Sequence, residues 1–247
     1  MSISDFFITV YSFFRHSSKR KFILKSLEFS KQNGIEIGGP SKIFSLKGHF
    51  PIYLFANSID GVNFKNETVW EGSISEGMNY QFHRKKGFQY IREATNLLDI
   101  ENNQYDFVLS CHSLEHVANP IKALKESNRI LKTNGKFVLI LPDKRFTFDK
   151  NRSYTTFEHL LNDELQNVDE KDTTHFEEVI NTNPDAQNAE KRQFLINEMT
   201  NNYQNRYVHH HVFSFEVIKK LLEHTGFEVT HQQALSPFHL VTIAQKK

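Results

Sequence analysis

Residues 105–142 read YDFVLSCHSLEHVANPIKALKESNRILKTNGKFVLILP, and this stretch decides the fold. The apolar run over residues 105–110 predicts a strand buried on both faces of a parallel sheet. Asn119-Pro120 then opens a helix with apolar residues at helical spacing, and Asn134-Gly135 closes it. Residues 136–141 form the next strand, which a proline ends. The order strand, helix, strand requires a right-handed crossover between parallel strands.

Upstream of this unit, residues 34–38 form a short apolar strand that runs into a Gly-Pro-Ser turn. Glycines at the end of a first strand allow the backbone to approach a ligand closely. The next apolar run, residues 51–56, is the candidate for the second strand, with Asp60 just past its end.

Downstream, residues 150–207 are polar and acidic but keep apolar anchors at helical spacing, which predicts a helical insertion that forms a lid. Ser214 then caps a helix that ends at Gly226. Two strands follow over residues 227–230 and 238–244, and their short separation predicts an antiparallel hairpin at the sheet edge.

The predicted fold is therefore α/β, a Rossmann-like three-layer sandwich. Its sheet is mostly parallel and seven-stranded, with an antiparallel C-terminal hairpin strand and a helical insertion. We expect one domain over residues 1–247, in which residues 1–30 are an N-terminal helical extension, because the length suits one core better than two.

The amino terminus contains a short apolar run over residues 5–14, followed by basic residues. It is about half of the ~20 residues that a membrane span needs, and no small-residue cleavage site follows it. We expect an amphipathic helix packed on the domain and no integral membrane span; a peripheral membrane contact or the face of a homodimer is the alternative.

The composition argues against some classes of function. The chain has 30 Lys and Arg against 29 Asp and Glu, a net charge of +1, so no overall field attracts nucleic acid or an anionic membrane. The single cysteine, Cys111, excludes an intramolecular disulfide and any CxxC site. We expect a cytoplasmic protein that does not bind nucleic acid.

The spacing of polar residues suits a cofactor with an adenosine and a charged tail. Such a cofactor needs glycines after the first strand, which residues 36–41 supply, and an acid near the second strand for the ribose hydroxyls. Asp60 is that acid, although the weak marking of the second strand leaves another residue open. Glu93, Ala94 and Thr95 precede the fourth strand, where a polar contact to the adenine edge belongs.

These segments together resemble the class I S-adenosylmethionine-dependent methyltransferases. The resemblance rests on Glu36-Ile37-Gly38-Gly39-Pro40, on Glu93-Ala94-Thr95-Asn96-Leu97, and on residues 105–117 with their Leu114-Glu115-His116 segment. It covers residues 34–142 strongly and the chain from 207 onward weakly. It implies S-adenosyl-L-methionine as cofactor, and a cofactor site made of Glu36, Gly38, Gly39, Pro40, Asp60, Glu93, Ala94, Thr95, Ser110, His112 and His116.

The sequence departs from the family pattern in its glycine loop, and some of the proposed site residues have alternative roles. The loop reads Gly-Gly-Pro-Ser in place of the more usual Gly-x-Gly-x-Gly. Glu36 is alternatively a carboxylate held by backbone N–H groups for stability alone. Glu93 is alternatively a solvated residue, and His116 alternatively packs or caps the helix that follows.

The run His209-His210-His211 is the second cluster of chemical interest. Neighbours in extended chain alternate faces, so at most two of these imidazoles converge on one metal, completed by His175, Asp143 or His116. No spacing such as HExxH supports this, and we expect no metal. A general base that faces the acceptor is the preferred interpretation, with Asp143, His210 and His211 as candidates.

The expected activity is methyl transfer to a small-molecule acceptor, such as a hydroxyl of a saccharide-like compound, with acceptor selectivity in the insertion. Two alternatives remain at this point. A nicotinamide-dependent oxidoreductase also uses a glycine turn and a ribose acid, but the loop lacks the third glycine. A non-catalytic subunit that binds the cofactor and regulates a partner is the other.

Overall fold

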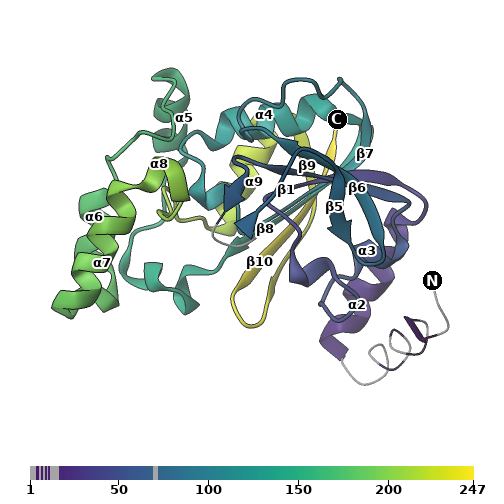
Figure 1. Cartoon of the computed structure of the whole chain (residues 1–247), viewed down its shortest axis with the longest axis horizontal. Coiled ribbons are helices and arrows are strands. Elements are labelled where there is room, and N and C mark those ends of the chain that lie inside the picture. Colours follow the sequence, from purple (N-terminus) through teal and green to yellow (C-terminus); the bar gives the residue numbers. More distant parts are fainter. Residues whose placement is uncertain (1–3, 6, 8, 10, 12–16, 69–71) are drawn as a thin grey trace.

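The computed structural model describes the whole chain except residues 1–3, 6, 8, 10, 12–16 and 69–71. It confirms the α/β fold. Within the described residues an eight-stranded sheet has the order β5-β6-β2-β1-β7-β8-β10-β9, and a two-stranded sheet pairs β3 with β4 (Figure 1). The strands are β1 (Asn33–Ile37), β2 (Ser58–Asn63), β3 (Glu67–Thr68), β4 (Gly72–Ser73), β5 (Gly77–Phe82), β6 (Lys85–Ile91), β7 (Tyr105–Cys111), β8 (Leu131–Pro142), β9 (Phe227–Leu235) and β10 (His239–Lys246).

The central five strands of the large sheet, β6, β2, β1, β7 and β8, run parallel. β1 pairs with β2 on one side and with β7 on the other, and the chain order reverses here. Ligands of open α/β sheets bind at such a switch point, beyond the carboxyl ends of the strands. The predicted strands at residues 34–38, 105–110 and 136–141 are confirmed as β1, β7 and β8.

Helices cover both faces of the sheet, which makes three layers (Figure 1). One apolar core joins β1, β7 and β8 to α4, α5 and α9, and the other joins the sheet to α2 and α3. The α-helices are α2 (Ser17–Ser26), α3 (Ile52–Phe55), α4 (Pro120–Ile130), α5 (Phe157–Leu165), α6 (Phe176–Thr182), α7 (Ala189–Thr200), α8 (Asn202–Asn205) and α9 (Phe215–His224).

Local sequence signals explain the helix ends. The side chain of Asn119 accepts a hydrogen bond from Lys122 N, and Pro120 occupies the first turn of α4. The Ser214 hydroxyl likewise accepts from Val217 N at the start of α9, and Gly226 follows this helix with a φ of +88°. The starts of both helices were predicted from these residues. The predicted end of the first helix is wrong, because α4 ends at Ile130 and Asn134-Gly135 lie within β8.

The predicted position of the second strand is wrong. Residues 52–55 form α3, a single helical turn that starts after Pro51, and the strand is β2, six residues further on. Gly61 interrupts the apolar pattern of this strand, so the sequence does not mark it as a strand. The fold nevertheless requires a glycine at this position. A Cβ there would lie 2.0 Å from the ring of Tyr80, which packs across β2.

The number of strands also differs from the prediction of seven. β5 pairs antiparallel with β6 and extends the sheet by one strand beyond β6. At the opposite edge β10 pairs antiparallel with both β8 and β9, which confirms the C-terminal hairpin.

The segment over residues 150–207 contains α5, α6, α7 and α8. Figure 1 shows these helices gathered at one end of the sheet, away from α2. α5 contacts α4 and α9, and Val179, Met199 and Val208 form a small separate core in the outer part of the segment.

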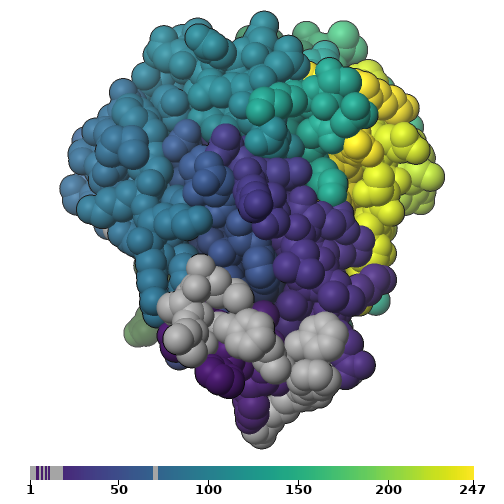
Figure 2. Space-filling view, turned by 90° about the vertical axis from the view of Figure 1, so that its right-hand side faces the viewer, coloured from purple at the N-terminus to yellow at the C-terminus, as the bar shows by residue number. Residues whose placement is uncertain are grey.

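The amino-terminal helix predicted over residues 5–14 falls largely outside the described residues. Further along, α2 packs beside the C-terminal hairpin, where Lys21 Nζ donates to Gln233 Oε1 over 3.2 Å. Figure 2 shows this segment (purple) between residues of the β5–β6 region (blue) and the hairpin (yellow). Within the described chain, no helix combines the length and the apolar character needed to cross a membrane.

Candidate functional site

A cavity of about 390 Å³ opens at the carboxyl ends of β1, β2, β6 and β7. Its size falls in the range of about 300–1,000 Å³ that is typical of small-molecule sites. The lining residues come from the sheet edge and from the insertion: Ile37, Gly38, Pro40, Ser41, Lys42, Val62, Asn63, Phe64, Arg92, Glu93, Ala94, Cys111, His112, Ser113, His116, Val117, Glu170 and Arg206.

Gly38 forms the floor of the cavity where β1 ends. Its φ of +79° is rare for residues with a side chain, and its N–H donates to Val62 O over 2.8 Å. A Cβ at this position would lie 2.7 Å from the Ser113 hydroxyl and 2.8 Å from the Ser113 Cβ. Only glycine therefore keeps the loop and the turn after β7 this close together.

Glu36 lies behind the loop and does not line the cavity. Its fully buried carboxylate accepts hydrogen bonds from Ser41 N, over 3.1 Å, from the Tyr53 hydroxyl, and from the Tyr80 hydroxyl over 2.7 Å. Burial raises the pKa of Glu36, and these hydrogen bonds oppose that rise. Gly39 is required beside it, because a Cβ would lie 2.3 Å from the Glu36 carboxyl carbon.

Asp60 lies in the middle of β2 rather than past its end. Its carboxylate accepts from Phe88 N over 2.8 Å and from the Tyr105 hydroxyl over 2.7 Å, and it is not part of the cavity lining. Asn63 and Phe64 line the cavity instead, where the ribose acid was expected. Asn63 Nδ2 also donates to Gly39 O over 3.0 Å, which ties the end of β2 to the loop.

Glu93 and Ala94 line the cavity after β6, but Thr95 does not. Glu93 Oε1 lies 2.5 Å from an Arg206 Nη, and the other Arg206 Nη lies 2.8 Å from Glu170 Oε2. Burial raises the pKa of Glu93 and of Glu170, and the Arg206 charge opposes the rise in both. Arg206 and Glu170 belong to the insertion, so this ion-pair cluster closes the insertion onto the sheet edge.

The residues after β7 form the opposite wall. Ser110 lies inside the strand and does not line the cavity, whereas His112 and His116 do. His116 Nδ1 donates to Val208 O over 3.1 Å. His112 Nε2 lies 2.8 Å from His239 Nδ1, and burial together with His239 lowers the pKa of His112 to about 3.

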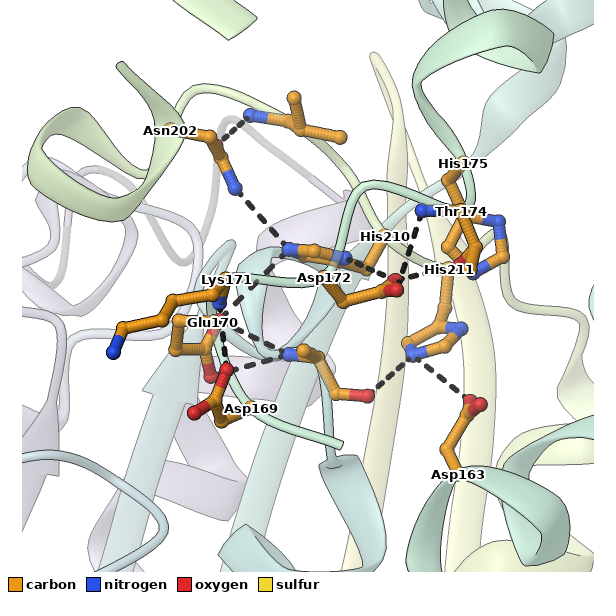
Figure 3. A network of polar contacts seen from close by, with 12 residues as sticks. Asp163, Asp169, Glu170, Lys171, Asp172, Thr174, His175, Asn202, His210 and His211 are labelled. Carbon is orange, nitrogen blue, oxygen red and sulfur yellow. Dashed lines mark hydrogen bonds and ion pairs between the residues drawn. The ribbon is translucent and has the colours of Figure 1, made fainter. Parts of the chain in front are cut away.

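The three candidate general bases lie outside the cavity lining. Asp143 follows β8, where the Arg145 guanidinium bonds its carboxylate and lowers its pKa. His210 is fully buried between Asn202, 3.2 Å away, and Asp172, 3.8 Å away (Figure 3). His211 Nε2 contacts Ala118 O over 3.1 Å, and burial holds the pKa of His211 well below its usual range.

A second, more open cavity of about 660 Å³ shares part of its wall with the first. The shared residues are Ser41, Lys42, Cys111 and His112. Its remaining lining includes His49, Phe238 and His239 from two further segments. No sequence signal predicts this cavity, because the turn before β10 reaches it only through the pairing of β10 with β8.

Sequence reasoning missed two further parts of the first cavity. Asn63 and Phe64 were missed because the second strand was placed too early. Glu170 and Arg206 carry no motif, and only the folding of the insertion brings them to the sheet edge. Asn63 and Phe64 could have been predicted from their position at the end of β2, had this strand been placed correctly.

The sheet order and the glycine loop beneath the cavity define the Rossmann-like class of nucleotide-cofactor proteins. A family model described as a methyltransferase domain matches residues 14–232. The chain therefore belongs to this methyltransferase family, and its cofactor is S-adenosyl-L-methionine. The resemblance seen in the sequence is confirmed at this level. A search of curated proteins finds no match.

Solved structures show the same likeness in fold. The PH0226 protein from Pyrococcus horikoshii OT3 is 13% identical, with 94% of this chain and 90% of that chain covered and a TM-score of 0.50. A methyltransferase from Methanosarcina mazei is 14% identical, with 91% and 96% covered and a TM-score of 0.49. A Mesorhizobium loti methyltransferase is 12% identical, with 90% and 95% covered and a TM-score of 0.49.

Substituting Gly38 with alanine tests the floor of the cavity. We expect Gly38→Ala to weaken S-adenosylmethionine binding by about 10- to 100-fold, since a side chain in this backbone region costs about 1–3 kcal/mol and also meets Ser113. Gly72→Ala is the matched control, because Gly72 has a φ of +69° with nothing within 4 Å of the added Cβ. Isothermal titration of both variants checks this; equal affinities would contradict it.

The Glu36→Gln substitution tests the support beneath the loop. A glutamine amide must direct its NH₂ either at the two tyrosine hydroxyls or at Ser41 N, so one donor set loses its acceptor at a cost of about 1–3 kcal/mol. We expect lower resistance to urea and weaker cofactor binding. The exposed Glu190→Gln on α7 makes the same chemical change and is expected to alter neither. Matching results for both variants would refute the supporting role of Glu36.

Proposed function

We propose that this methyltransferase acts on a small hydroxylated acceptor, of which a saccharide-like compound is one example. The observation that carries the proposal is the pair of adjoining cavities, which share Ser41, Lys42, Cys111 and His112. The first suits the cofactor and the second suits the acceptor. The ion pairs of Arg206 with Glu93 and Glu170 close the first cavity on the side of the insertion, which favours small molecules.

The residues of the first cavity fit S-adenosylmethionine. Gly38 leaves a space that any side chain would fill, at the point where β1 ends beneath the cavity. Asn63, Phe64, Glu93 and Ala94 are placed to hold the adenosine. When bound, the cofactor supplies a methyl group on a sulfonium. The protein's part is then to orient the acceptor and to exclude water.

The lining of the second cavity favours a hydroxylated acceptor. Imidazoles of His49, His112 and His239 offer both hydrogen-bond donors and acceptors, and Phe238 offers an apolar face. Lys42 and Lys47 add positive charge at the same cavity, which suits an acceptor that also carries an acidic group.

His239 is the general base in this proposal, in place of Asp143, His210 and His211. Glu115 Oε1 lies 3.6 Å from His112 Nδ1, beyond hydrogen-bond distance, and a negative charge there favours the His112 tautomer with its proton on Nδ1. His112 Nε2 then accepts from His239 Nδ1, 2.8 Å away. This arrangement leaves His239 Nε2 unprotonated in the acceptor cavity, ready to receive the hydroxyl proton.

Three other expectations stay predictions: the homodimer, the cytoplasmic location and the lack of nucleic-acid binding. The near-balance of charge supports the last of them.

Transfer of labelled methyl groups from S-adenosylmethionine tests the acceptor class. The panel contains sugars, sugar phosphates and nucleotide sugars, with matched amines and thiols, total RNA and an unfolded protein as comparators. We expect label on a hydroxyl of a small molecule. Label confined to RNA, to protein or to the amines would overturn the proposal while leaving the methyltransferase family intact.

The His239→Ala substitution tests the general base once an acceptor is known. We expect kcat to fall by about 10²- to 10⁴-fold, the usual contribution of acid–base catalysis. The affinity for S-adenosylmethionine is expected to stay within about threefold, because His239 lines only the second cavity. His49→Ala, in the same cavity, is expected to raise KM more than it lowers kcat. A kcat unchanged in His239→Ala would remove the base from the mechanism.

A further inference from the structure

Three histidines from separate parts of the insertion region converge away from both cavities. His159 lies on α5, His175 directly precedes α6, and His211 lies in the extended segment before α9. Each offers a ring nitrogen within 4.8 Å of the others. Asp163 joins them one helical turn after His159, on the same face of α5.

The spacing of these atoms matches a metal's coordination shell. In a tetrahedral zinc site with Zn–N bonds of 2.0–2.1 Å, the ligand atoms lie about 3.3 Å apart. His159 Nε2 lies 3.2 Å from His175 Nε2 and 3.3 Å from Asp163 Oδ2. His211 lies beside the same carboxylate, with its Nε2 3.8 Å from Asp163 Oδ2.

The hydrogen bonds around His211 leave one ring nitrogen available as a ligand. Nε2 contacts the carbonyl oxygen of Ala118, which only accepts, so Nε2 carries the proton. Nδ1 is then unprotonated, and within the described chain it is buried without a hydrogen-bond partner. Metal-bound histidines typically donate their other N–H to such a carbonyl group. Figure 3 shows His211 between Asp163 and His175.

A hydrogen-bonded histidine pair is the simpler interpretation of this cluster. It accounts for the contact between His159 and His175. It does not account for Asp163 Oδ2, which is also buried without a hydrogen bond among the described residues, nor for His211 Nδ1. Buried polar atoms without partners are rare in proteins, and a bound ion is a recognised explanation for them.

We propose that His159, His175 and His211 bind a divalent transition metal of the zinc type, with the Asp163 carboxylate as its neighbouring acid and fourth ligand. Imidazole ligands favour Zn²⁺ and its relatives over Mg²⁺ and Ca²⁺, which take oxygen ligands. The sequence argued against a metal because it showed no compact motif. The proposed set includes His175 and His211 from the group considered there, excludes Asp143 and His116, and adds His159.

The metal holds the insertion in place rather than taking part in catalysis. It joins α5, the start of α6 and the segment before α9, where Val179, Met199 and Val208 form only a small core. The loop between Asp163 and His175 carries Glu170, which lines the cofactor cavity and pairs with Arg206. The metal therefore fixes the position of Glu170 at the cavity.

Metal content and metal binding of the full-length protein test this proposal. Protein produced with added zinc, then dialysed against a weak chelator, is expected to hold about one equivalent of zinc by mass spectrometry. Co²⁺ added to metal-free protein is expected to give the intense visible bands of a tetrahedral site. His159→Ala and His175→Ala are expected to lower the zinc content about tenfold or more. His224→Ala, at an exposed histidine on α9, is the control and keeps the zinc.

The same experiment separates this cluster from a second one. Glu115, His116 and His209 also bring possible ligand atoms within 4.8 Å of one another. Zinc lost on His209→Ala but kept in His159→Ala and His175→Ala would overturn the proposal. So would a wild-type protein with native circular dichroism that binds neither Zn²⁺ nor Co²⁺ in solution. That wild-type measurement decides the matter even where a variant fails to fold, and it is independent of methyl transfer.

Discussion

The structure depends on one buried carboxylate. Glu36 sits in the first strand of the sheet with no access to solvent, and a buried charge is costly unless it is fully hydrogen-bonded. Two tyrosine hydroxyls and the Ser41 N–H supply these bonds. Because the tyrosines come from α3 and β5, the carboxylate joins both elements to the glycine loop. The shape of the cavity at this edge of the sheet follows from this arrangement.

The insertion over residues 150–207 closes the side of the first cavity that the sheet edge leaves open. The sheet edge forms the floor and two walls of the cavity. Arg206, far along the chain from Glu93, pairs with that acid and closes the third side. The same arginine stacks over the ring of Phe64, 4.7 Å from the ring centroid, at the end of β2. Opening of this side therefore breaks ion pairs and a cation–π contact together, which suits a lid over a reactive cofactor.

The sequence predicted those elements whose signals are local. The strands at both ends of α4, the caps at Asn119 and Ser214, and the turn at Gly38 each rest on a few neighbouring residues. β2 was misplaced because its glycine makes room for Tyr80 of a strand that had not been recognised. The prediction that Asp60 binds the ribose rested on this misplaced strand; Asp60 lies inside β2 and does not line the cavity. Glu170, Arg206 and His239 reach the cavities only through tertiary contacts, which no spacing in the sequence reveals.

The central claim is that the cavity above Gly38 holds S-adenosylmethionine. A crystal structure with bound S-adenosylhomocysteine tests it most directly. The account predicts the amino-acid tail against Gly38 and Ser41, the adenosine between Phe64 and Ala94, and the sulfur directed toward His112 and the second cavity. A nucleoside bound elsewhere on the protein, or in this cavity with its sulfur turned away from His112, would contradict the account.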